Sequence, residues 1–293
     1  MFSGSIVAIV TPMRADGSID YAVWHELLEW HAHSGTSGIV VGGTTGESPT
    51  LSDAELGELT ARACQQLKGR VAVIAGAGTS STAGTVAKVS LLATLPVDGL
   101  LLVTPAYNRP SQEGLVRHFT AASGAAAGKP VILYNVPART AVDMVPATVA
   151  RLARVPGIVG LKEAVPDPQR VRELLSQVPS GFAVLSGDDA TARESIRAGA
   201  RGVISVTANV APRQMSDMVA AALAGDHARA EALDGPLAGL HRDLFVEANP
   251  IPVKWLLLQM GRIGSGVRLP LTPLADGLQG SVRRAARAAG LLA

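Results

Sequence analysis

Residues 157–162 read Gly-Ile-Val-Gly-Leu-Lys, a short apolar run that ends in a charged side chain. Seven similar runs occur elsewhere in the chain, and each is continuously apolar rather than alternating. Continuous runs are typical of strands in a parallel sheet that is buried on both faces. The eight expected strands are Ser5–Val10, Gly38–Val41, Val71–Ala75, Gly99–Val103, Val131–Tyr134, Ile158–Leu161, Phe182–Leu185 and Gly202–Val206.

Stretches with helical periodicity separate these runs, for example at Ala22–His33, Ala54–Leu67 and Gln112–Ala125. Eight strand-then-helix units predict an α/β protein of the (β/α)₈ TIM barrel class. An open, doubly wound sheet is the alternative that this pattern leaves.

The chain continues past the eighth expected strand with helical patterns only. Pro212–Leu223 would close the barrel, so that residues 1–224 would contain the active site. Residues 225–293 would form a small C-terminal helical extension, according to the start and stop signals of helices. Its expected helices are Ala228–Leu240, Pro252–Met260 and Pro273–Ala289.

The composition indicates a well-packed protein. Of the 293 residues, 47% are hydrophobic and 17% are charged, which is enough apolar material for a large core. The net charge of +2 is spread along the chain, so nucleic acid is not an expected partner. No apolar run approaches the ~18 residues of a membrane helix, and the N-terminus lacks the basic segment of a signal peptide. We therefore expect a cytoplasmic protein.

Lysine is rare, and one lysine has an unusual position. Only Lys162 ends an apolar strand run, at the strand end where barrel enzymes carry their active sites. It either forms a buried ion pair with Glu163 or Asp188, or acts as a nucleophile. Apolar neighbours would favour the neutral amine, which attacks a ketone to form an imine. The five lysines, against 21 arginines, are Lys68, Lys88, Lys129, Lys162 and Lys254.

Hydroxyl groups also gather at the ends of the expected strands. Two of the three tyrosines, Tyr107 and Tyr134, lie there, where a phenol can relay protons or simply bond to the backbone. Thr44 and Thr45 lie between glycines after the second strand. Their hydroxyl and N–H groups suit a carboxylate, although the same residues are ordinary turn material.

Other chemistries lack their motifs. Glu47 stands where a phosphate-binding loop needs its lysine, and His31 and His33 are badly spaced for a metal on one helix face. The nucleophile elbow of serine hydrolases is missing. We expect neither a metal nor an organic cofactor.

Five motifs, in order along the chain, resemble those of the dihydrodipicolinate synthase family, now called 4-hydroxy-tetrahydrodipicolinate synthases. The resemblance runs from Met1 to the C-terminus and includes the segment Asn249–Trp255. The motifs are Gly43–Ser48, Tyr107–Gly114, Leu133–Thr140, Gly160–Ala164 and Ser186–Asp189.

The resemblance implies a reaction between pyruvate and aspartate-4-semialdehyde in lysine and diaminopimelate biosynthesis. Lys162 would hold pyruvate as an imine, and its enamine would attack the aldehyde, with no cofactor other than this covalent bond. Gly187 and Ile204 would supply backbone beside the imine. The family is typically a homotetramer made of two tight dimers, so a homotetramer or a dimer is implied.

The resemblance also assigns the polar groups. Thr44, Tyr134 and Tyr107 would form a proton relay, with Tyr107 supplied by the neighbouring subunit. Thr45 would bind the pyruvate carboxylate, and Arg139 the carboxylate of the semialdehyde.

Three residues depart from the pattern of the family. Ala141 replaces a common glycine, and Ala248 replaces a proline before Asn249. Ala106 replaces a second tyrosine before Tyr107, which removes aromatic area from the expected dimer contact. None of these changes removes a catalytic group.

Members of the family that are inhibited by lysine bind it in a polar cleft at the tight-dimer interface. The matching positions here lack most of the polar groups, because Gly84 offers no carboxylate, Ala106 no phenol and Leu56 no polar atom. We therefore expect weak inhibition by L-lysine, or none. The five positions are Asp53, Leu56, Ser80, Gly84 and Ala106.

Two other functions remain open. A paralogous aldolase, lyase or dehydratase would use the same imine chemistry on a keto-sugar acid. Arg139 favours the short, carboxylate-bearing acceptor, because polyhydroxylated acceptors suit neutral hydrogen-bonding groups. A catalytically silent barrel that binds a keto acid would be expected to have lost the lysine or a relay hydroxyl, and all of these are present.

Overall fold

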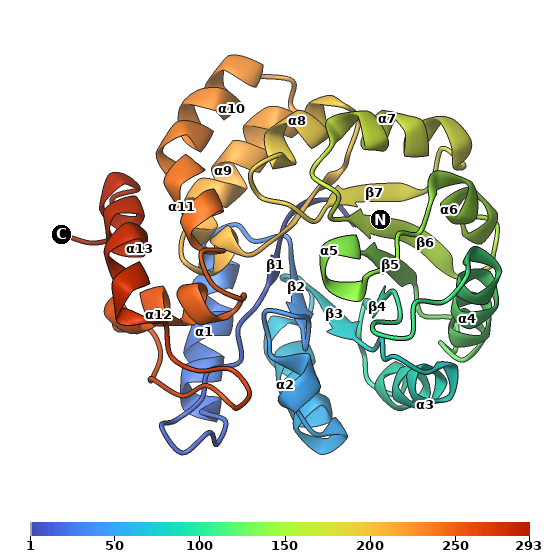
Figure 1. Ribbon diagram of the computed structural model, residues 1–293, viewed down its shortest axis with the longest axis horizontal. Coiled ribbons are helices and arrows are strands. Elements are labelled where there is room, and N and C mark those ends of the chain that lie inside the picture. The colour runs from blue at the N-terminus through green and yellow to red at the C-terminus, as the bar shows by residue number, and fades with distance from the viewer. Residues whose placement is uncertain (1) are drawn as a thin grey trace.

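The computed structural model describes residues 2–293, and its centre is a closed barrel of eight parallel strands (Figure 1). Each strand lies within two residues of an expected run at both ends, so the sequence prediction is confirmed. The strands are β1 (Gly4–Ala8), β2 (Gly38–Val41), β3 (Ala72–Gly76), β4 (Gly99–Val103), β5 (Val131–Asn135), β6 (Ile158–Glu163), β7 (Ala183–Ser186) and β8 (Gly202–Ser205).

Pairing between the first and last strands closes the barrel. In the register of β1 and β8, Gly4 lies opposite Gly202 and Ile6 opposite Ile204. Because β1 also pairs with β2, neither strand is an edge, and the open-sheet alternative is wrong.

A helix follows each strand, and these helices surround the barrel (Figure 1). The short helix α5 (Pro137–Thr140) is additional and comes directly after β5. The outer helices are α1 (Tyr21–His33), α2 (Asp53–Leu67), α3 (Thr82–Ala93), α4 (Gln112–Gly124), α6 (Pro146–Leu152), α7 (Pro168–Gln177), α8 (Ala192–Arg197) and α9 (Pro212–Leu223).

The strands bury both of their faces, which explains why they read as unbroken apolar runs. Alternate side chains point out to the helices and form the larger core, including Leu133 and Leu161. The others fill the interior of the barrel as a separate cluster. That inner cluster consists of Ile6, Ala8, Val40, Ile74, Leu101, Ile132, Tyr134, Val136, Leu185 and Ile204.

The region after α9 contains helices where they were expected, but two of the three are shorter than the sequence pattern suggested, and the third, α12, has the expected length. The expected helix Ala228–Leu240 is broken by a 3₁₀ turn at Gly235–Leu237, because Pro236 has no N–H and its ring crowds the preceding turn. No helix within residues 2–293 combines the length and the apolar character that crossing a membrane requires. The C-terminal helices are α10 (His227–Asp234), α11 (Ala238–Asp243), α12 (Ile251–Gln259) and α13 (Asp276–Ala288).

Candidate active site

Lys162 and Tyr134 lie side by side in the mouth of the barrel. They are register partners on β6 and β5, and both side chains are buried. Because Tyr134 belongs to the inner cluster, its partner position also faces the interior. The Lys162 Nζ atom lies 4.2 Å from the centre of the Tyr134 ring. The amine and the phenol therefore share one small space.

The carboxylates considered as ion partners of Lys162 are engaged elsewhere. Glu163 points to the outside of the barrel, where it lies 3.4 Å from Arg170. The Asp188 carboxylate accepts hydrogen bonds from the N–H and the hydroxyl of Thr191, at 2.9 and 2.7 Å. Within residues 2–293 no ion pair of Lys162 is found. Within the described chain the amine is therefore not held by a carboxylate, and the ion-pair alternative is wrong.

Gly187, after β7, approaches the lysine more closely than any larger residue would allow. A Cβ atom at this position would lie 3.0 Å from Lys162 Cε and 2.9 Å from Ala164 Cβ. The Gly187 N–H donates to the Glu163 carbonyl over 2.6 Å. Ile204 on β8 is buried in the inner cluster with Tyr134. Both predicted neighbours of the imine thus line the barrel interior.

The glycine-rich loop after β2 brings the two threonines to the site. Thr44 and Tyr134 line one small cavity. Thr45 is buried, and its hydroxyl accepts a hydrogen bond of 2.9 Å from Asn249 Nδ2. Gly76 leaves the loop room, because a Cβ atom there would lie 2.2 Å from the Gly42 carbonyl oxygen.

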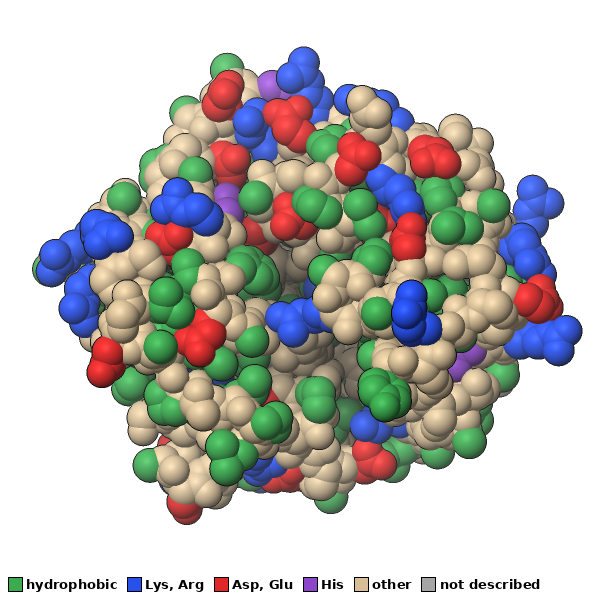
Figure 2. All heavy atoms as spheres, in the orientation of Figure 1, with side chains coloured by type: hydrophobic (Ala, Val, Ile, Leu, Met, Phe, Trp, Pro, Cys, Tyr) green, Lys and Arg blue, Asp and Glu red, His purple; other side chains and the backbone are tan. Residues whose placement is uncertain are grey.

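Arg139 lies on α5 at the rim of a larger cleft. Its Nη2 atom donates to the Asn249 carbonyl over 3.3 Å. Thr44 also lines this cleft, so Arg139 and the threonine loop border the same space. In the orientation of Figure 1, the molecular surface is hollowed near its centre, with a basic side chain at the rim (Figure 2).

Tyr107 does not join the other predicted residues within its own chain. Its side chain is 95% exposed, and its backbone adopts a left-handed conformation with φ of +73°. Such a φ is uncommon for a non-glycine residue and is often linked to function. It lines neither the cavity of Thr44 and Tyr134 nor the larger cleft.

A polar network outside the barrel supports the two strand ends that carry Tyr134 and Lys162. Asn135 and Glu163 are the next register partners, and Asn135 Nδ2 donates to both Glu163 oxygens at 3.0 and 3.2 Å. Arg170 on α7 binds Asp143 through two hydrogen bonds of 3.0 and 2.7 Å. Asn135 also donates to Asp143 over 2.8 Å. The network thus connects β5, β6 and α7 directly behind the reactive side chains.

Burial raises the pKa of Glu163 to about 7, against opposing contributions from the Val165 N–H, Arg170 and Asn135. The folded protein therefore keeps this proton up to near neutral pH, whereas an unfolded chain releases it near the usual value of 4.5. The stability that this group contributes is complete below pH 4.5 and is lost as the pH rises through 7.

We expect Glu163→Gln to remove this pH dependence, because the amide stays neutral. As the pH rises from 5 to 8, wild type should lose up to about 3 kcal/mol of unfolding free energy that the variant keeps. Denaturant unfolding of both proteins across this range measures the difference. A difference between the two proteins that does not change with pH would contradict the assignment.

Sequence reasoning missed several of these contacts. Asn249 contacts both Thr45 and Arg139, yet the sequence only indicated that it belongs to a recognisable motif. Glu163 was considered only as a partner of Lys162, and the Arg170–Asp143 pair was not anticipated. Within residues 2–293, the side chains of His, Cys, Asp and Glu nowhere form a group of three or more that could hold a metal ion.

A closed barrel with an unpaired, buried lysine at the carboxyl end of a strand is the arrangement of lysine-dependent, Schiff-base-forming lyases. Residues 1–289 match the model of the dihydrodipicolinate synthetase family. The chain therefore belongs to this family.

Curated relatives and solved structures agree along the whole length of the chain. It is 52% identical to the 4-hydroxy-tetrahydrodipicolinate synthase of Methylococcus capsulatus and 50% identical to that of Pseudomonas aeruginosa, with 100% of each chain covered. The crystal structure of the chloride-inhibited dihydrodipicolinate synthase from Acinetobacter baumannii, complexed with pyruvate, is 46% identical. It superposes with a TM-score of 0.97 and full coverage of both chains.

Proposed function

We propose that the chain is a 4-hydroxy-tetrahydrodipicolinate synthase that joins pyruvate to aspartate-4-semialdehyde. The observation that carries the proposal is the Lys162 amine, buried 4.2 Å from the centre of the Tyr134 ring and without a carboxylate partner in the described chain. Full-length similarity to synthases of this name supports the choice of reaction. No metal or organic cofactor takes part in the proposed chemistry.

The reaction begins when Lys162 Nζ adds to the keto carbon of pyruvate and water leaves, which forms an imine. Loss of a methyl proton gives an enamine, whose carbon bonds to the aldehyde carbon of the semialdehyde. The amino group of the semialdehyde then attacks the imine carbon, closes the ring and releases Lys162. The aldehyde oxygen remains as the hydroxyl of the product.

We assign the surrounding groups as follows. Thr44, Tyr134 and Tyr107 carry protons to and from the reacting oxygen, and Thr45 binds the pyruvate carboxylate. Arg139 at the open rim binds the carboxylate of the second substrate, through charge-assisted hydrogen bonds. The backbone of Gly187 and of Ile204 lies beside the imine.

Tyr107 reaches the site from the neighbouring subunit in this proposal. Its exposure of 95%, and its position outside the cavities of its own chain, support a role in a partner. The active form is accordingly a dimer, or a homotetramer built from two such dimers. We further propose a cytoplasmic enzyme in which residues 1–224 carry the catalytic groups and residues 225–293 form the helical extension.

An assay of acceptor choice tests the function. Product formation from pyruvate is compared with aspartate-4-semialdehyde and with sugar aldehydes at equal concentration, using a coupled readout. The proposal expects efficient turnover with the semialdehyde alone. Preference for a sugar aldehyde would instead support the paralogous aldolase, and imine formation without any turnover would support a keto-acid-binding barrel.

L-Lysine at millimolar concentration is expected to leave the activity unchanged. Asp53, the one carboxylate at the five candidate positions, already lies 3.1 Å from Lys88 Nζ. Among the described residues lining the adjoining cleft, Lys88 and Arg139 are cations and none is a carboxylate, so a second amine is disfavoured. An exposed ion pair contributes only about 0–1 kcal/mol, whereas millimolar binding needs about 4 kcal/mol.

Steady-state rates measured at increasing concentrations of L-lysine test whether the enzyme is inhibited. A submillimolar inhibition constant would show that the cleft, or its alignment with the family, has been assigned incorrectly.

A further inference from the structure

A buried ion pair joins the C-terminal helices to the threonine loop. Lys254 on α12 donates through Nζ to Glu47 Oε1, and Glu47 follows Thr45 by only two residues. The side chains are 6% and 0% exposed. The second Glu47 oxygen accepts the Arg268 N–H over 3.1 Å. One carboxylate of the loop is therefore held by two segments from the far end of the sequence.

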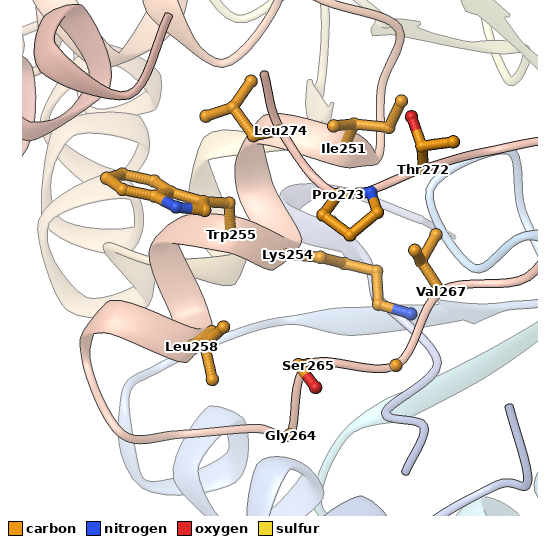
Figure 3. Close-up of a pocket in the computed structure, with 11 residues that line it drawn as sticks. Ile251, Lys254, Trp255, Leu258, Gly264, Ser265, Val267, Thr272, Pro273 and Leu274 are labelled. Atoms are coloured by element: carbon orange, nitrogen blue, oxygen red, sulfur yellow. The ribbon is translucent and has the colours of Figure 1, made fainter. Parts of the chain in front are cut away.

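The surroundings of Lys254 isolate this pair. The side chain runs from α12 toward the segment that carries Val267, whereas Trp255 points the other way (Figure 3). A small pocket lies beside it, and among the described residues that line this pocket there is no carboxylate. Burial lowers the pKa of Lys254, and the nearby Glu47 opposes that shift.

Stability alone does not account for the pair. Two charges lose their hydration on burial, and apolar residues of the same volume are often at least as stabilising. Separating the partners would, however, leave an uncompensated buried charge, which is strongly unfavourable, so the two side chains are kept in contact. What these partners hold is the loop that carries Thr44 and Thr45.

The loop itself needs such support. Glu47 adopts a left-handed backbone with φ of +57°, which is uncommon for a non-glycine residue and persists only where surrounding contacts hold it. Asn249, just before α12, donates to the Thr45 hydroxyl over 2.9 Å. The Thr11 hydroxyl donates to the Gly46 carbonyl over 2.7 Å. Two of the residues that hold the loop therefore come from one segment: Asn249 lies in the turn before α12, and Lys254 lies on α12.

We propose that Lys254 is a positioning residue for pyruvate: through Glu47 it holds the Thr44–Thr45 loop in the geometry that receives the substrate carboxylate. The inference rests on the proposed function, since it assumes that pyruvate occupies this loop. The C-terminal helices then act on the active site and do more than cover the barrel. Arg139 lies on a different loop, after β5, so the second substrate should be affected much less.

The test uses Lys254→Met, Glu47→Gln and the double variant Glu47→Gln/Lys254→Met in the full-length enzyme. We expect Lys254→Met to raise the KM for pyruvate about tenfold, because small misplacements at a binding loop are costly. The KM for the semialdehyde should stay within about twofold. Borohydride trapping at subsaturating pyruvate should slow in parallel, because this reaction depends on pyruvate alone.

The double variant separates positioning from folding. It leaves no uncompensated charge in the core, so its Tm should exceed that of Lys254→Met, yet its KM for pyruvate should remain raised. If Lys254→Met does not fold, the double variant carries the kinetic measurement. Arg70→Met is the control, because Arg70 forms an exposed ion pair with Glu29 and should change neither KM.

Two results would overturn the inference. One is a Lys254→Met enzyme with a lower Tm and an unchanged KM for pyruvate, and the other is a double variant that regains both Tm and KM. In either case wild-type enzyme still forms the pyruvate imine. A wild-type enzyme that forms no imine would instead overturn the proposed function itself.

Discussion

Replacing Lys162 with alanine should lower kcat/KM by about 10³-fold or more, because loss of a covalent nucleophile removes the route to the enamine. No second lysine can take over. Lys88 lines the larger cleft but is paired with Asp53, Lys254 is paired with Glu47, and the other two lie at a helix end and in a turn. The effect should fall on kcat, while the fold is kept. Steady-state kinetics together with a thermal unfolding scan measure both quantities.

Lys68→Ala is the matched control, because Lys68 is an exposed lysine at the end of α2. It should keep wild-type kinetics. Full activity of Lys162→Ala would contradict the proposed mechanism, and equal losses in both variants would point to a general effect on the protein.

Arg139→Ala should lower kcat/KM for the semialdehyde while formation of the pyruvate imine survives. The lost charge-assisted hydrogen bonds are worth roughly 1.5–3 kcal/mol, which corresponds to about 10- to 150-fold. The position of Arg139 at the exposed rim, bonded to the Asn249 carbonyl at 3.3 Å, explains why Lys162 should be little affected. Steady-state kinetics with each substrate varied in turn, together with borohydride trapping of the imine, separate imine formation from the reaction with the semialdehyde.

Arg139→Lys serves as the control that keeps the charge but loses the planar, two-pronged geometry. Its activity should lie between those of wild type and Arg139→Ala. If Arg139→Ala also loses imine formation, Arg139 organises the lysine pocket and does not select the acceptor.

The barrel could be predicted from the sequence because its strands are buried on both sides and leave unbroken apolar runs. The strand ends were less certain, for a physical reason visible in β6. Lys162 and Glu163 extend this strand beyond its apolar run, since one side chain points into the barrel and the other reaches Arg170 outside it. In the C-terminal region, Pro236 interrupts a helix that periodicity alone would continue.

The sequence could point to Lys162 and Tyr134 as neighbours at one barrel end, because each residue type is rare and its position unusual. Contacts between segments that are far apart in the chain produce no recognisable pattern in the local sequence. Asn249 and Thr45 are 204 residues apart, and Lys254 and Glu47 are 207 apart. Nothing in the local pattern around either pair indicates its partner, because only the packing of the C-terminal segment against the loop after β2 brings them together.

Reduction of the pyruvate complex tests the central claim most directly. Wild-type enzyme is incubated with pyruvate and borohydride, which converts an imine into a stable secondary amine, and the modified lysine is then located by peptide mapping. The account predicts one adduct, on the peptide that contains Lys162, and no adduct in Lys162→Ala. An adduct on Lys254 or another lysine, or no adduct at all in active wild-type enzyme, would contradict it.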